Sequence, residues 1–276
     1  MGSRDREALV PVLVYHRLAA KVDEASIEVP TVRVGDFERQ IQHLVESGYG
    51  ATSLRELTQS GGGQRERSIV ITFDDGWGST LTYALPILER HGLTATLFPT
   101  TDPRASVFAR WRELDQPLGP DDWAALAAAG WEIGSHTCTH PPLVECRSDE
   151  LMEELTSSRC AIEAAVGAKV EFLATPFGLS NWRVERAARS AGYRGMCPGS
   201  AGLCRWGQPA FQLRRVGVPT HISLPSYSQL LTSRGADIAR LKSTAKKLVR
   251  RAIGHRNSMR LRAVLRRDRP RIGDRS

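Results

Sequence analysis

Two adjacent acidic residues, Asp74 and Asp75, stand directly after an apolar run at residues 68–73 and directly before Gly76. The apolar run predicts a buried strand, and the glycine permits a tight turn after it. Ligands bind at the carboxyl ends of strands in parallel α/β sheets, so two carboxylates placed there suit metal binding or general acid–base chemistry. A surface turn with an aspartate helix cap would explain the same residues without any chemistry.

Two histidines, His136 and His140, follow another predicted strand at residues 131–133 and the turn residue Gly134. Both imidazoles can face one ion if this segment forms a helical turn. Two imidazoles and one carboxylate form a ligand set common in metal hydrolases, which leaves positions open for water and substrate. Two unrelated loop histidines are the alternative. Because both motifs follow predicted strands, we expect them on one rim of the sheet.

Strand-like and helix-like segments alternate through most of the chain. Strands are predicted at residues 11–16, 68–73, 94–98, 131–133, 171–173, 193–196 and 213–218. Helices are predicted at residues 36–46, 53–59, 79–91, 121–129, 149–166 and 181–191. Strands separated by helices predict an α/β fold with a parallel sheet. The pattern alone does not separate a closed barrel from an open, doubly wound sheet.

The composition fits a globular protein. The chain has 276 residues, of which 41% are hydrophobic and 25% charged, as is usual for soluble domains. No apolar run approaches the ~20 residues of a membrane span, and the first one, residues 9–15, is too short for a secretory signal. The cysteine count is odd, at five, and with no export signal recognised this favours reduced thiols. No CxxC pair supports a structural zinc site. We therefore expect a cytoplasmic protein.

The positive charge is concentrated at the end of the chain. Residues 237–276 hold 14 Lys and Arg against 3 Asp, a net charge of +11, whereas the whole chain carries +8; residues 1–236 therefore carry −3. Apolar residues recur at helical spacing between Leu241 and Leu265, which predicts a basic amphipathic tail. We accordingly expect a catalytic domain at residues 1–236 and a helical tail at residues 237–276. The tail suits peripheral binding to an anionic membrane surface or plain solvation, and no nucleic-acid partner is expected.

Three motifs occur in an order that resembles the polysaccharide deacetylases of the NodB-homology type, carbohydrate esterase family 4. They are TFDDG at residues 72–76, HTCTH at residues 136–140 and TPFG at residues 175–178. The resemblance extends over residues 10–218. The opening VLVYHRL, followed by DFERQIQHLVESGY, is similar to the poly-N-acetylglucosamine deacetylase branch in particular. The resemblance implies a distorted (β/α) barrel of about seven parallel strands and the removal of an N-acetyl group from an amino sugar.

The same resemblance assigns roles to individual residues. It implies a divalent ion, most often zinc, held by Asp75, His136 and His140. It makes Asp74 the candidate general base, with a helix cap or a brace for the turn as the alternative. The backbone N–H of Phe177, after Pro176, corresponds to the family's oxyanion donor. Two tryptophans beside the motifs, Trp77 and Trp182, are candidates for stacking on a sugar ring, with packing as the alternative for each.

The chain departs from the family pattern at two places. Ala174 stands where the third motif usually begins with an arginine that orients the base. The late Leu-x-His motif, whose histidine is the general acid, has no clear counterpart, and His221 has the wrong spacing and suits the surface. His16 ends the first predicted strand and should reach the same rim, so we expect it to act as acid or substrate contact; a buried structural histidine is the alternative.

These departures leave three functions open. The first is a metal-dependent N-deacetylase acting on a glycan, a glycolipid precursor or a glycosylated metabolite. The second is a catalytically impaired carbohydrate-binding protein anchored by its tail. The third is an amidohydrolase acting on a non-sugar amide, because related barrels also open cyclic ureides. A complete set of metal ligands favours the two catalytic functions.

Overall fold

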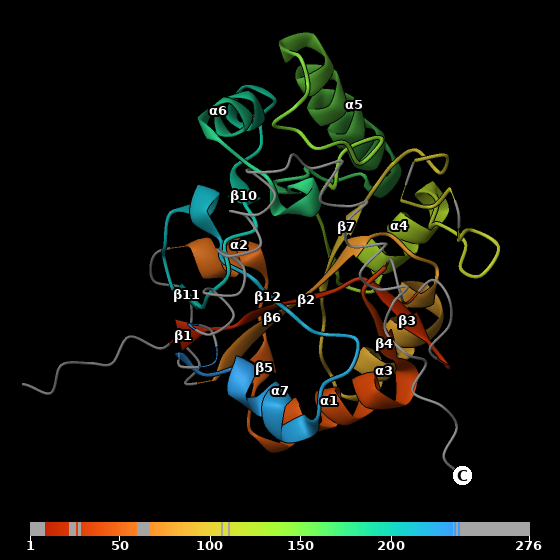
Figure 1. The fold of residues 1–276 in the computed structure, drawn as a ribbon, viewed down its shortest axis with the longest axis vertical. Helices are drawn as coiled ribbons and strands as arrows, with labels where there is room; N and C mark the ends of the chain where they lie inside the picture. The colour runs from red at the N-terminus through yellow and green to blue at the C-terminus, as the bar shows by residue number, and fades with distance from the viewer. Residues whose placement is uncertain are drawn as a thin grey trace, which may run out of the picture.

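A parallel sheet forms the centre of the protein (Figure 1). The computed structural model describes residues 9–21, 26, 29–59, 67–105, 107–109, 111–233, 235 and 237. The strands follow the order β12-β2-β6-β7-β8, and every neighbouring pair is parallel. Their bounds are β2 Val12–Tyr15, β6 Ser68–Asp75, β7 Thr96–Pro99, β8 Glu132–Ile133 and β12 Val216–Gly217. All residues of β6 are buried, as expected for the middle strand of a covered parallel sheet.

Two further parallel strands, β9 Phe172–Ala174 and β10 Gly195–Cys197, extend the sheet beyond β8. A parallel bridge between Ser135 and Leu173 joins them to the end of β8. On the other side of β10, the N–H of Leu213 donates to the carbonyl of Met196 at 3.2 Å, and the chain then enters β12. The prediction of an α/β fold with a parallel sheet is confirmed. Among the described residues no ladder joins β10 to β12, so full closure into a barrel stays a prediction.

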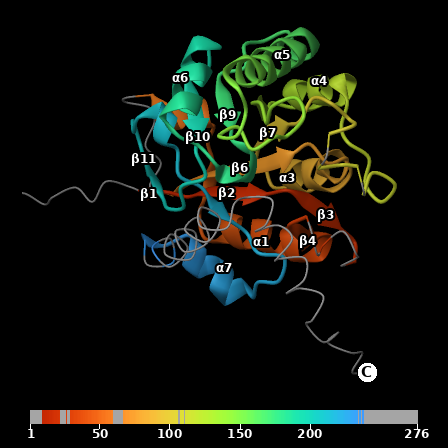
Figure 2. The ribbon, with the colours of Figure 1, turned by 45° about the horizontal axis from the view of Figure 1, so that its top comes forward.

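Helices cover both faces of this sheet. In Figure 2, α4, α5 and α6 lie on one side of β6 and β2, and α1 and α7 lie on the other. The helices are α1 Val34–Glu46, α2 Leu54–Thr58, α3 Leu85–Arg90, α4 Pro120–Ala128, α5 Ser148–Val166, α6 Trp182–Ser190 and α7 Leu224–Leu230, with a π-helical turn at Thr80–Ala84 before α3 and 3-10 turns at Pro176–Gly178 and Ala210–Gln212. Short strands complete the fold: the pair β1 Leu9–Val10 and β11 Cys204–Arg205, the pair β3 Arg17–Ala19 and β4 Thr31–Arg33, and β5 Gly50–Ala51 against β6.

Helix α1 illustrates how the predicted apolar faces build the core. Phe37, Ile41 and Leu44 lie at helical spacing and are completely buried. The ring of Phe37 meets those of Tyr15 and Phe73, from β2 and β6, at centroid distances of 5.1 and 5.8 Å. Burial of a side chain of this size stabilises a fold by about 1.5–3 kcal/mol. The helix therefore fixes β2 and β6 side by side, and both strands end at the same rim.

One predicted cap is placed differently in the structure. Asp36 was expected to precede the first helix, but α1 already begins at Val34. Asp36 lies in its first turn and pairs with Arg33 and Arg39, where a carboxylate also favours the helix dipole.

No helix among the described residues is long and apolar enough to cross a membrane. The amphipathic tail predicted for residues 237–276 lies outside the described residues except for Asp237. It therefore stays a prediction.

Candidate metal and catalytic site

The two aspartates lie where β6 ends. Both still pair with β7, Asp74 opposite Phe98 and Asp75 opposite Pro99, and both are buried. Asp75 has a φ of 72° and the following Gly76 a φ of 93°. Left-handed backbone at a residue with a side chain costs on the order of 1–3 kcal/mol. This strained turn ends the strand abruptly and holds the two carboxylates next to each other at the rim of the sheet.

The structure brings Asp75 together with both predicted histidines. Oδ1 of Asp75 lies 3.6 Å from Nε2 of His136 and 3.5 Å from Nε2 of His140. One possible ligand atom from each residue lies within 4.8 Å of the others, and all three residues are buried. Among the described residues, Oδ1 has no hydrogen-bond partner. A buried carboxylate oxygen without a donor, facing two imidazole nitrogens, fits a divalent cation.

His136 is held in the form that a metal ligand needs. Its Nδ1 lies 2.8 Å from the carbonyl oxygen of Ala174, and a carbonyl only accepts, so Nδ1 carries the proton and Nε2 keeps its lone pair. Burial lowers the pKa of His136 to about 4, so the ring is neutral at physiological pH. Ala174 thus contributes to the site through its backbone carbonyl, a role that its side-chain type does not predict.

The segment from His136 to His140 is not the helical turn that was expected. Thr137 has a φ of 73° and His140 a φ of 61°, and no helix is assigned there. Two left-handed residues bend the chain so that both rings face Asp75, and their centroids lie 4.9 Å apart. The spacing of the histidines was informative, but the backbone reaches the same result through strained bends.

Asp74 forms a buried ion pair with Arg215, just before β12. The two guanidinium Nη atoms donate to the two carboxylate oxygens at 2.6 and 2.7 Å, and Nη1 also lies 3.2 Å from Oγ1 of Thr72. Burial raises the pKa of Asp74, but the charge of Arg215 and its hydrogen bonds outweigh burial and hold the pKa well below its usual value. Asp74 is therefore ionised and oriented.

Sequence reasoning missed Arg215. Ala174 stands where the family has the arginine that orients the base, and no motif marks Arg215 as its substitute. A signal was present, because Arg215 falls inside the last predicted strand, at residues 213–218, and the structure buries it. A charged residue on the inner side of a buried strand requires a partner of opposite charge.

His16 directly follows β2, on the same rim as Asp74, and is partly buried. Its Nδ1 is buried and has no hydrogen-bond partner among the described residues. Tyr15 pairs with Phe73 in the neighbouring strands β2 and β6, so His16 and Asp74 each follow a paired residue at the same end of the sheet. His221, the other histidine considered, is exposed.

Trp77 occupies a different place from the one expected of a substrate contact. It is completely buried, its indole N–H donates to Oδ2 of Asp75 at 3.0 Å, and its ring packs against Phe108 at 4.9 Å. A side chain without exposure cannot stack on a sugar. Trp77 instead orients the carboxylate of Asp75 through this hydrogen bond. Trp182, in contrast, is 71% exposed at the start of α6.

The TPFG segment lies against the candidate metal ligands. Pro176 is buried, and Phe177 has a left-handed backbone with a φ of 58°. The ring of Phe177 lies 4.7 Å from that of His140. The turn that carries the predicted oxyanion donor is therefore next to the candidate metal site.

Comparison with known proteins agrees with this arrangement. A family model described as polysaccharide deacetylase matches residues 61–196. YxkH of Bacillus subtilis, which bears the family's name, is 24% identical over 83% of this chain and 78% of its own length. A chitooligosaccharide deacetylase of Bradyrhizobium is 32% identical, but the match covers 45% of this chain and 52% of that relative. The deacetylase PplD of Streptococcus pyogenes has a similar fold, with a TM-score of 0.71 at 20% identity, over 82% of this chain and 99% of that structure.

The fold and the site define an α/β protein of the NodB-homology type, with an Asp–His–His cluster at the carboxyl ends of parallel strands. The chain belongs to the polysaccharide deacetylase family. The resemblance found in the sequence motifs is confirmed.

Proposed function

We propose that this protein is a metal-dependent hydrolase that removes an N-acetyl group from an amino sugar in a glycan, a glycolipid precursor or a glycosylated metabolite. The observation that carries the proposal is the buried Oδ1 of Asp75, which faces Nε2 of His136 and of His140 and has no donor among the described residues. These three residues would hold the ion, and their nitrogen and oxygen donors suit zinc. When bound, such an ion polarises an amide carbonyl and lowers the pKa of water toward ~7.

Asp74 is placed to act as the general base. Each carboxylate oxygen accepts one hydrogen bond from Arg215 and keeps a second lone pair for the proton of the attacking water. A base with a lowered pKa is weaker, but it is ionised at every pH at which the protein would work. Arg215 fixes the direction in which the remaining lone pairs point.

Two further groups complete the proposed reaction. The backbone N–H of Phe177 donates to the oxyanion that forms from the acetyl carbonyl, since its turn lies against His140. His16 gives a proton to the amine nitrogen as the carbon–nitrogen bond breaks, which releases acetate and the free amino sugar. A buried nitrogen that has no hydrogen-bond partner among the described residues, at the strand end next to that of Asp74, supports this role.

The substrate class is inferred from the relatives and from one exposed side chain. A relative matched over about half of its length is a chitooligosaccharide deacetylase, which favours a substrate containing N-acetylated sugars. Trp182 lies five residues beyond Phe177 and offers an exposed indole face, on which a pyranose ring can pack. We propose that it binds a sugar unit next to the one that is deacetylated.

The experiment is a screen for acetate release, with and without added zinc, from N-acetylhexosamine oligomers, nucleotide sugars, lipid-linked amino sugars and non-sugar amides. Zinc-dependent release from one of the amino-sugar classes, lost in an Asp75→Ala control, supports the proposal. Release from a non-sugar amide alone would replace the substrate class. Sugar binding without release from any substrate would make the protein an inactive carbohydrate-binding member of the family.

A further inference from the structure

The segment between the two candidate metal ligands needs support from outside itself. Left-handed backbone is unfavourable for a β-branched residue, yet Thr137 adopts it, as does His140. Within the segment, the N–H of His140 donates to Oγ1 of Thr137 at 3.1 Å. One local hydrogen bond does not define the path of five residues, so the spacing of the two imidazoles depends on neighbouring elements. The N–H groups of Thr101 and Asp102 donate to the carbonyls of Thr137 and Cys138 at 3.1 and 2.9 Å.

Glu154 of α5 supplies the side-chain part of this support. One of its oxygens, Oε2, accepts from the N–H of Cys138 at 2.8 Å and from the N–H of Thr139 at 2.9 Å. The other, Oε1, accepts from the hydroxyl of Thr139 at 2.5 Å. All three donors belong to the residues between His136 and His140. The Glu154 carboxylate therefore stabilises the bend between His136 and His140.

The type of side chain matters at this position. Three donors converge on two oxygens, and an ionised carboxylate accepts at both and donates at neither. A glutamine has one acceptor oxygen, and its NH₂ group would face at least one of the donors. Hydrogen bonds to a charged acceptor are also stronger than bonds between neutral groups. The isosteric amide is thus a poor replacement although it has the same size.

A second contact from α5 holds the beginning of the segment. Ser158, one helical turn after Glu154, lies with its hydroxyl 2.9 Å from that of Ser135. The hydroxyl of Ser135 also accepts from the N–H of Thr137 at 3.2 Å. One face of α5 therefore contacts the segment just before His136 and again just before His140.

We propose that Glu154 is a positioning residue for the metal site, which sets the separation of the two imidazoles and thereby the affinity for the ion. This inference rests on the proposed function only in taking Asp75, His136 and His140 as the ligands. Partners outside the ligand set typically change metal affinity by about 10–100-fold when they are replaced.

The test is the affinity for Zn²⁺ of purified Glu154→Gln, measured by competition with a chromophoric chelator. Its matched control is Glu153→Gln, which makes the same chemical change at the neighbouring residue. Within the described part of the chain, the Glu153 side chain accepts from Ser157 on the same helix and has no bond to the histidine segment. We expect Glu154→Gln to bind Zn²⁺ about 10–100-fold more weakly than the control. Saturating Zn²⁺ should then restore most of the acetate release.

A second variant, Thr139→Val, removes a single one of the three donors and should weaken Zn²⁺ binding by less than Glu154→Gln does. It keeps the proposal testable if Glu154→Gln does not fold. Equal Zn²⁺ affinities of Glu154→Gln and Glu153→Gln would overturn the proposal, as would wild-type affinity in Thr139→Val when Glu154→Gln is insoluble. A wild-type protein that binds no Zn²⁺, Co²⁺ or Mn²⁺ would instead contradict the proposed function.

Discussion

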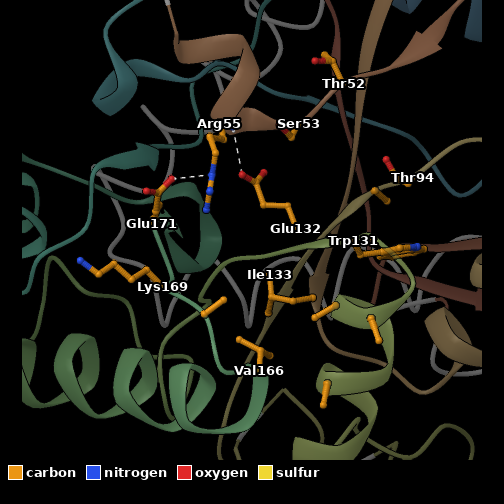
Figure 3. Close-up of a pocket in the computed structure, with 16 residues that line it drawn as sticks. Thr52, Ser53, Arg55, Thr94, Trp131, Glu132, Ile133, Val166, Lys169 and Glu171 are labelled. Atoms are coloured by element: carbon orange, nitrogen blue, oxygen red, sulfur yellow. Dashed lines mark hydrogen bonds and ion pairs between the residues drawn. The ribbon is translucent and has the colours of Figure 1, made fainter.

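Both ends of the parallel sheet hold carboxylates that are at least partly buried, but among the described residues only the carboxyl ends leave a ligand-type oxygen of this sheet without a donor. At the amino ends of the strands, a pocket of about 470 Å³ lies between α2, α4 and α5 (Figure 3). Glu132 in this pocket accepts from the N–H of Leu54, the N–H of Arg55 and the hydroxyl of Thr96. Glu171 pairs with Arg55 at 3.0 Å and with Arg194 at 2.8 Å. The acidic groups of this pocket therefore have the donors they need.

At the carboxyl ends of the strands, some buried polar atoms lack a hydrogen-bond partner. Oδ1 of Asp75 and Nδ1 of His16 are buried without a hydrogen-bond partner among the described residues. Four residues with side chains, Asp75, Thr137, His140 and Phe177, adopt left-handed backbone here. Strain and unsatisfied polar atoms persist only where something else compensates for them. In this protein the volume of a pocket is therefore a poor guide to a functional site. Buried polar atoms without a hydrogen-bond partner are a better guide.

Variants of the three candidate metal ligands should have the largest effects, and they test the contrast between the two ends of the sheet most directly. Asp75→Ala, His136→Ala and His140→Ala should each lower bound divalent metal and reduce acetate release to background, because each removes a ligand. Glu132→Gln, which changes a partly buried carboxylate at the other end of the sheet, should keep both. Metal content by atomic emission, together with an acetate assay, checks this. Full metal content and activity in all three variants would show that the ligands are elsewhere.

Asp74→Asn should retain the metal and lose about 10²–10⁴-fold in kcat, because the amide keeps the shape of the carboxylate but does not accept the proton. The measurement is kcat at saturating zinc. A loss of less than about threefold, far below the range for a general base, would remove Asp74 from this role.

His16→Ala should lower kcat by about 10²-fold, at the lower end for proton transfer, with little change in metal content or Tm. Its ring is partly buried, and Nδ1 has no hydrogen-bond partner among the residues that the structure describes, so its removal breaks few bonds. Unchanged kinetics, or a variant that simply unfolds, would favour a structural histidine.

Arg215→Lys should change the pH dependence more than the maximal rate. Arg215 is the main charge that lowers the pKa of Asp74, and burial acts in the opposite direction. A lysine does not reproduce the paired contacts, so the pKa of Asp74 rises and the carboxylate takes up a proton at higher pH. The acid limb of kcat/KM should therefore move to higher pH, with an activity loss of roughly tenfold for each unit by which it passes the assay pH.

The same substitution should lower stability above the pKa of an unfolded aspartate, about 3.9. A carboxyl group whose pKa is lower in the folded state stabilises the fold above that pH, and this contribution is lost as the pH falls through the folded value. Thermal unfolding at pH 7 and at pH 3 separates this effect from the kinetic one. An acid limb at the wild-type position would show that Arg215 does not act through Asp74.

The smallest effect is expected for Trp182→Ala. Aromatic contacts contribute about 0.5–1.5 kcal/mol beyond area burial, which corresponds to a loss of about 2–10-fold in kcat/KM. The loss should occur with oligomers and not with a single N-acetylhexosamine. Leu114→Ala is the control, because it also removes an exposed apolar side chain. An equal loss on both substrates would argue against a separate sugar-binding position.

The sequence predicted those features that are local in the chain. The strand before Asp74, the strand before His136 and the convergence of both motifs on one rim follow from apolar patterning and from the geometry of parallel sheets. The family motifs added the choice of Asp75, over Asp74, as the metal ligand.

Features that depend on contacts between distant segments were not predictable in this way. Arg215 and Asp74 lie 141 positions apart, and no local pattern pairs them. The bend between His136 and His140 depends on Glu154, which lies on another element. Trp77 was placed near the site correctly, but its burial is due to the packing of Phe108 and its neighbours. Motifs identify which residues meet, and tertiary packing decides how they are held.

The hydrogen bond from Trp77 to Asp75 also provides an optical reporter of the site. The indole N–H donates to one oxygen of the carboxylate whose other oxygen would face the ion, so occupancy changes the electric field at a completely buried fluorophore. Emission should respond to titration with Zn²⁺ and be quenched by Co²⁺, whose absorption permits energy transfer. Five other tryptophans contribute background, and Trp77→Phe identifies the part of the signal that belongs to this bond. Metal loading can thus be followed without any substrate.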